Sequence, residues 1–132
     1  LFCCLSPVFA DVEFDKGVNF YHQKNYPQAL KVFKSLAEQN HAEAQFNLGA
    51  MYQNGFGIEQ DIKNAIAWYK KSAGNNYVEA MFNLGSIYQN GIGVNKSPDK
   101  AIFWYEKAAN QGNEKAQAIL KKFLESGNNT LN

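Results

Sequence analysis

From Asp11 onward, apolar residues recur every three to four positions, and no stretch alternates between apolar and polar residues. That spacing is typical of amphipathic helices that each bury one side. It predicts an all-α protein built of three antiparallel helix hairpins and a final helix. The expected helices span about 12–24 and 27–38, 42–54 and 62–74, 78–90 and 98–110, and 114–126.

The second and third hairpins repeat each other with a period of 36 residues. Of the 34 pairs from 42/78 to 75/111, 17 are identical. A fixed period of this length indicates a solenoid of stacked units, in which neighbouring units bury one another. The first hairpin, 12–38, is a related unit with a link four residues shorter. A solenoid shifts the expectation for function towards binding and away from catalysis.

The starts of the second helices carry suitable capping residues. The 36-residue step places Asn25, Asp61 and Ser97 at one equivalent position. The side-chain oxygen of each can accept a hydrogen bond from an unpaired N–H of the first turn. Pro98 follows at the first helical position, where its missing N–H costs nothing.

Glycines mark the links inside the second and third hairpins. Gly55 and Gly91 are placed to adopt the left-handed conformation that ends a helix, and Gly57 and Gly93 then let the chain turn back. A phosphate-binding role is not indicated, because these glycines follow helices and lack a Lys, Ser or Thr at the spacing of a phosphate-binding loop.

The repeated apolar positions predict the core. Gly49 and Gly85, with Gly17 as their counterpart, are expected where a side chain would hold two helices apart, and Trp68 and Trp104 are expected to fill the space between helices. The other expected core residues lie on one face of each first helix: Ala44, Leu48, Tyr52, Ala80, Leu84 and Tyr88.

The last helix, 114–126, is expected to close the stack. Ala116 and Leu120 continue the repeated apolar series, but Lys121 stands where the other units have glycine. No partner helix is therefore expected to approach it, and a polar outer face suits a terminal unit. Ile119, Leu120, Phe123 and Leu124 are expected to cover the end of the core. Residues 127–132 are expected to form a flexible tail.

Composition excludes several classes of partner. The 132 residues suffice for one domain, and the net charge is +1 with no run of like charges. Neither a nucleic-acid footprint nor a polybasic membrane anchor is indicated.

The first ten residues differ from the rest, because they carry no charge and are apolar except at Ser6 and Pro7. Val8 and Ala10 lie at −3 and −1 before Asp11, which predicts the end of a secretory signal peptide cleaved after Ala10. A short apolar tail is the alternative. Lipidation of Cys4 is disfavoured because Cys3 precedes it. The processed chain would lack cysteine and could enter an oxidising compartment, periplasmic or extracellular, without forming disulfides.

The repeated motif resembles the Sel-one-like repeat (SLR), a longer relative of the tetratricopeptide repeat. The motif reads Ala-x-Ala-Gln-x-x-Leu-Gly-x-x-Tyr-x-x-Gly-x-Gly, then Ala-x-x-Trp-Tyr-x-Lys-x-Ala. The full motif is present at 42–57 with 65–73, and most of it recurs at 78–93 with 101–109, where Val78 replaces the first Ala. Residues 12–38 resemble a tetratricopeptide unit, and 114–126 resemble half of an SLR. The exported subgroup with a cysteine pair in each repeat is not matched.

The resemblance implies a right-handed α-solenoid whose first helices line a concave face that binds a protein or peptide. Many bacterial SLR proteins are exported, and the family is known for adaptors. On this analogy, the phenylalanines could form an aromatic ladder and Asn47 and Asn83 could hold a peptide backbone. The candidate partner-binding residues are Phe14, Val18, Tyr21, His22, Glu43, Phe46, Asn47, Ala50, Gln53, Asn54, Glu79, Phe82, Asn83, Ser86, Gln89 and Asn90.

A purely structural role competes for the same positions. The phenylalanines could seal the seam between units and the asparagines could tie loops. Glu43 and Glu79 open their helices, where a carboxylate favours the positive end of the helix dipole.

Catalytic residues are scarce. His22 and His41 are the only histidines, and neither has metal-ligating neighbours at suitable spacing, so no cofactor, metal or enzymatic activity is predicted. His41 is expected to be a solvated loop residue. The main hypothesis is an exported adaptor. The alternatives, both by analogy, are binding or hydrolysis of a β-lactam-type small molecule and a secreted factor that acts on a host. The oligomeric state is not predicted.

Overall fold

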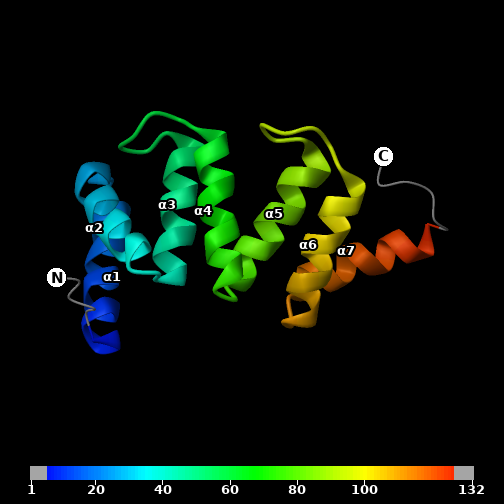
Figure 1. Cartoon of the computed structure of the whole chain (residues 1–132), viewed down its shortest axis with the longest axis horizontal. Coiled ribbons are helices and arrows are strands. Elements are labelled where there is room, and N and C mark those ends of the chain that lie inside the picture. The colour runs from blue at the N-terminus through cyan, green and yellow to red at the C-terminus, as the bar shows by residue number, and fades with distance from the viewer. Residues whose placement is uncertain (1–5, 127–132) are drawn as a thin grey trace. The chain divides into compact units, whose positions relative to one another are not determined.

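The computed structural model describes residues 6–126, and all regular structure in that range is α-helical (Figure 1). The bounds of α3 to α6 coincide with those predicted, and those of α2 and α7 differ by one residue at one end. Cys3, Cys4 and the expected tail lie outside the described residues. The helices are α1 (Pro7–His22), α2 (Tyr26–Glu38), α3 (Ala42–Asn54), α4 (Ile62–Gly74), α5 (Val78–Asn90), α6 (Pro98–Asn110) and α7 (Glu114–Glu125).

Helix α1 begins five residues before its predicted start at residue 12. Ser6 is its N-cap residue and Pro7 occupies its first turn. A proline suits that place because its fixed φ is already helical and its missing N–H would have no partner there. The prediction set the first ten residues apart by their composition, and it missed this start signal. None of the described helices combines the length and apolarity needed to cross a bilayer.

Two compact units divide the chain at Asn75/Asn76. In the first, α1 packs on α2, α2 on α3, and α3 on α4. The side chains of α2 and α3 supply the main buried cluster, onto which residues of α1, α4 and the link between α3 and α4 pack. The buried members of the cluster are Ala29, Phe33, Leu36, Ala37, Ala44, Leu48 and Met51.

In the second unit, α5 packs on α6 and α6 on α7. Leu84, Tyr105 and Ala116 are at most 1% exposed and represent the three helices in its core. The prediction that Leu124 covers the end of the core is wrong, because its side chain is 75% exposed. Lys121 is exposed, as expected.

The predicted caps form at two of the three second helices. The side chain of Asp61 accepts from the N–H of Asn64 at 3.0 Å, and that of Ser97 accepts from the N–H of Lys100 at 3.4 Å. Asn25 occupies the N-cap position of α2, but its side chain makes no capping bond. Its ψ of 69° departs from the extended value near 97° that the other two adopt.

Candidate partner-binding face

A glycine in each first helix lies directly over a buried aromatic ring. A Cβ at Gly49 would lie 2.9 Å from the ring of Tyr69, and one at Gly85 would lie 2.6 Å from the ring of Tyr105. Both rings are 1% exposed. Real Cβ atoms essentially never come so close, so these positions require glycine, as the repeat predicted. In the first hairpin, Gly17 stands in the same relation to the ring of a phenylalanine, Phe33, at 2.8 Å.

The tyrosines, rather than the tryptophans, fill the space between helices. Trp68 and Trp104 are only half-buried. The Nζ of Lys71 lies 4.3 Å from the centre of the Trp68 ring, a cation–π contact at the surface. The predicted role of the tryptophans is therefore wrong in part, since adjacent residues on a helix point about 100° apart and only one of each Trp-Tyr pair can face the core.

Each buried tyrosine also contacts two candidate binding residues. In the first unit, the ring centre of Phe46 lies 5.5 Å from that of Tyr69. The hydroxyl of Tyr69 donates to Oε1 of Gln53 at 2.7 Å. Phe46 and Gln53 are seven residues apart on α3 and share one side of the helix. Tyr69 therefore contacts that side of α3 through both its ring and its hydroxyl.

The second unit repeats the arrangement. Phe82 lies 5.5 Å from Tyr105 between ring centres, and the hydroxyl of Tyr105 donates to Oε1 of Gln89 at 2.6 Å. Burial raises the pKa of Tyr105, and a hydrogen bond with Ser86 partly opposes that shift. The phenol is therefore protonated at neutral pH and can donate to the glutamine.

The asparagines at the centre of the candidate face have free amides. The side chains of Asn47 and Asn83 are half-buried, and neither has a hydrogen-bond partner among residues 6–126. Neither ties a loop in this structure. Asn54 and Asn90 are instead engaged locally, since the amide of each donates at 2.9 Å to the carbonyl four residues earlier, that of Ala50 and Ser86 respectively.

The remaining candidates divide between surface and core. Glu43 and Glu79 are exposed in the first turns of α3 and α5, where the helix dipole favours them. His22 is exposed. Phe14 and Val18 are half-buried and pack against the main cluster of the first unit, so α1 contributes more to the core than to an open face.

An aromatic cluster beneath the link between α3 and α4 was missed by the sequence reasoning. Tyr26 and Phe56 stack with ring centres 4.6 Å apart and planes 9° apart, and Tyr21 packs edge-on to Tyr26 at 5.5 Å. Burial, and secondarily the neighbouring Tyr26, raise the pKa of Tyr21. A Cβ at Gly57 would lie 3.0 Å from Tyr26, which explains the second glycine of the link. The sequence signal was the aromatic at Phe56 between two glycines.

His41 is a structural residue and not the solvated loop residue that was expected. Its Nδ1 accepts from the N–H of Ala44 at 3.2 Å, so the imidazole caps α3. The ring stacks on Phe14 with centres 5.0 Å apart and planes 20° apart. Only 16% of the side chain is exposed. His41 is largely buried because it is the N-cap residue of α3, and the start of α3 lies against residues of α1 and α2.

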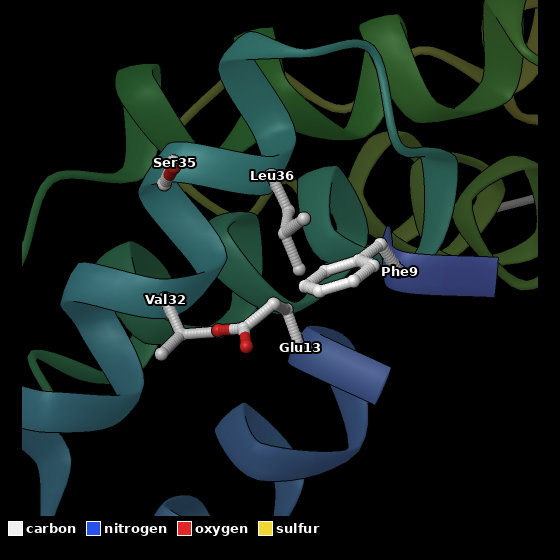
Figure 2. Close-up of a pocket in the computed structure, with 5 residues that line it drawn as sticks. All are labelled: Phe9, Glu13, Val32, Ser35 and Leu36. Carbon is white, nitrogen blue, oxygen red and sulfur yellow. The ribbon is translucent and has the colours of Figure 1, made fainter. Parts of the chain in front are cut away.

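A hollow of about 350 Å³ lies between the start of α1 and α2 (Figure 2). In Figure 2 the ring of Phe9 lies near the end of Leu36, and the carboxylate of Glu13 approaches Val32. That carboxylate already pairs with Lys16 at 2.5 Å. The hollow is mainly apolar and has few groups to orient a ligand. No three His, Cys, Asp or Glu residues in the described part of the chain are grouped to hold a metal ion.

Comparison with known proteins places these features in a family. The Sel1 repeat profile matches residues 13–41, 42–77 and 78–113. Among curated proteins, the ERAD-associated E3 ubiquitin-protein ligase component HRD3 of Candida glabrata is 40% identical over 45 residues. That segment covers 34% of this chain and 5% of HRD3.

Solved structures show the same fold. A Sel1 repeat protein from Oxalobacter formigenes matches with a TM-score of 0.79 and 33% identity over 90% of this chain and 51% of its own. The protective antigen c5321 of uropathogenic Escherichia coli, described as having an SLR fold, matches with a TM-score of 0.81 and 28% identity. The match covers 90% of this chain and 26% of c5321. Helicobacter pylori cysteine rich protein B matches with a TM-score of 0.67 and 29% identity, over 70% of this chain and 69% of its own. The predicted all-α solenoid class is confirmed.

Proposed function

This chain belongs to the Sel1 repeat family, and we propose that it is an exported adaptor that binds a protein or peptide on the first-helix face. Each unit has such a face by itself, formed by Phe46, Asn47 and Gln53 of α3 in the first unit and by Phe82, Asn83 and Gln89 of α5 in the second. Sel1 repeat proteins are helical-repeat modules for protein interaction and are typically non-enzymatic scaffolds.

One observation carries the proposal. Asn47 and Asn83 occupy the same place in two repeats, beside a half-buried phenylalanine, and their amides are not used by the described fold. An amide offers two donors and an acceptor, which is the combination that pairs with a peptide backbone. The adjoining ring offers apolar surface to a partner side chain. The asparagine amides are therefore available to a partner, whereas the phenylalanine rings also pack on Tyr69 and Tyr105.

The test is capture of a partner from a cell-envelope extract by crosslinking, with the natural chain and variants side by side. The Asn47→Ala/Asn83→Ala pair should lose the captured protein while retaining the helical circular dichroism of the natural chain. Asn110→Ala, an exposed asparagine at the end of α6, is the matched control and should capture normally. Equal capture by all three chains would refute the assignment of this face.

Export is proposed together with binding. Cleavage after Ala10 would remove Val8 and Phe9, which are 74% and 60% exposed, together with Ala10, which is half-buried against the main cluster. Cell fractionation with mass analysis of the N-terminus tests this proposal. A processed chain that starts at Asp11 in the envelope or medium is expected. An unprocessed chain retained in the cytoplasm would contradict it.

A further inference from the structure

We infer that the side-chain amides of Gln53 and Gln89 donate hydrogen bonds to main-chain carbonyls of an extended peptide, and that Tyr69 and Tyr105 orient those amides. The inference rests on the proposed function of the first-helix face and adds its hydrogen-bond donors and ligand class. It applies to each unit by itself.

The hydrogen bonds fix which end of each amide is available. The hydroxyls of Tyr69 and Tyr105 donate to Oε1 of the glutamines at 2.7 and 2.6 Å. Because a side-chain amide is planar, the hydrogen bond that holds its oxygen against the tyrosine hydroxyl directs its NH₂ group away from the tyrosine. Neither Nε2 donates to any residue from 6 to 126. Each half-buried glutamine therefore presents two unused donors in a defined direction.

The first hairpin shows that the hydroxyl is not needed for packing. Phe33 occupies the place of Tyr69 under Gly17, is 1% exposed, and packs there without a hydroxyl. The residue four positions after that glycine is Tyr21, not glutamine. The buried hydroxyl and the glutamine thus occur together in the second and third hairpins, and both are absent from these positions of the first. That pairing indicates that the hydroxyl serves the glutamine rather than the stack.

The charges around the glutamines select the ligand class. Helix α3 contains one charged residue, Glu43, and α5 contains one, Glu79. Without Lys or Arg on either helix, the surface does not favour a phosphate or an acidic peptide. Neutral donors beside half-buried Phe46 and Phe82 instead suit backbone carbonyls flanked by an apolar side chain. An extended segment leaves such carbonyls unpaired.

The test uses a peptide selected on the natural chain from a random-sequence phage library and then synthesised. The Tyr69→Phe/Tyr105→Phe chain should bind it about tenfold more weakly, which corresponds to roughly 1.4 kcal/mol for the two misplaced donor pairs together. Gln53→Leu/Gln89→Leu should lose at least as much. Tyr52→Phe is the matched control, because it removes from the same α3 helix a hydroxyl that has no hydrogen-bond partner among the described residues.

A backbone change in the peptide separates positioning from general loss of structure. Replacing single peptide amides by esters weakens one carbonyl acceptor at a time. At the contacting carbonyl, the ester should weaken binding to the natural chain but not to the Gln→Leu chain, which is the signature of a direct pair. Additive losses at every carbonyl would overturn the inference.

The remaining outcomes distinguish the two proposals. If the Tyr→Phe and Gln→Leu chains bind normally while Asn47→Ala/Asn83→Ala does not, the glutamine inference fails and the proposed function stands. If the library yields no peptide, or every variant of the face binds normally, both fail.

Discussion

The hydroxyl of Tyr105 donates to Oε1 of Gln89 at 2.6 Å beside Gly85, where a Cβ would collide with the tyrosine ring. The glycine admits the ring, and the ring carries the hydroxyl to the first-helix face. A residue buried on the second helix thereby sets the direction of an amide on the surface of the first. The same relation joins Tyr69 and Gln53 in the other unit.

Adding a methyl group at Gly85 should destabilise the fold. Gly85→Ala places a Cβ 2.6 Å from a ring that is 1% exposed and cannot move into solvent. We expect a loss of about 1–3 kcal/mol in the free energy of unfolding, measured in urea. Gly74→Ala is the control, because nothing lies within 4 Å of its added Cβ. It should be stabilising by about 0.4–1 kcal/mol. Equal effects of the two substitutions would show that the close approach is not rigid.

His41 should be replaceable by another capping residue but not by alanine. His41→Ala removes both the bond to the N–H of Ala44 and the stack on Phe14, and should cost about 1–2 kcal/mol of unfolding free energy. His41→Asn restores the cap and should recover part of that loss. Thermal unfolding followed at 222 nm compares the variants. An alanine variant as stable as the natural chain would return His41 to the role of a solvated loop residue.

Alkaline pH should weaken the fold through Tyr105. Burial raises its pKa above the unfolded value of 10.0, so the ionised form favours the unfolded chain. The associated stability is fully present below pH 10 and is lost as the pH rises through the native pKa. Urea unfolding between pH 8 and pH 11.5 should show that decline, and Tyr105→Phe should make it shallower. An unchanged pH profile in the phenylalanine variant would mean that Tyr105 ionises as it does in the unfolded chain.

Gln45 should contribute modestly to stability through an amide network. It is 2% exposed, donates to the carbonyl of Ala37 at 3.1 Å and accepts from Asn75 at 2.9 Å. Gln45→Met introduces the residue that the next repeat has at Met81 and should cost about 1 kcal/mol. The loss is small because the Ala37 carbonyl also accepts the N–H of Asn40. Urea unfolding measures it, and a stabilised variant would show that the network costs more in desolvation than its bonds return.

The helix bounds and the glycines were predictable because the repeat states each of them twice. The repeat period, the capping residues and the glycines at Gly49 and Gly85 each reflect a local requirement of the backbone. Such requirements restrict the residue type at a position and can therefore be read from the sequence. The Tyr–Gln pairs were not predictable, because adjacent Trp68 and Tyr69 are both large and aromatic. Which of them faces the core depends on the rotation of the second helix against the first, and that rotation is set by packing.

The capping role of His41 was missed for a related reason. Histidine is not among the common capping residues, and its place depends on stacking with Phe14, which is 27 positions earlier in the chain. Long-range contacts of this kind leave little trace in local sequence. The proposed binding role of the face likewise depends on which side-chain amides remain without a hydrogen bond once the helices have packed, and the sequence does not show this.

Chemical-shift mapping of the ¹⁵N-labelled chain with the library-selected peptide tests the central claim most directly. We expect the largest changes on the backbone of residues 46–54 and 82–90 and on the side-chain NH₂ signals of Asn47, Gln53, Asn83 and Gln89. Changes confined to α4, α6 or the hollow beside Phe9, with those amide signals unmoved, would contradict it.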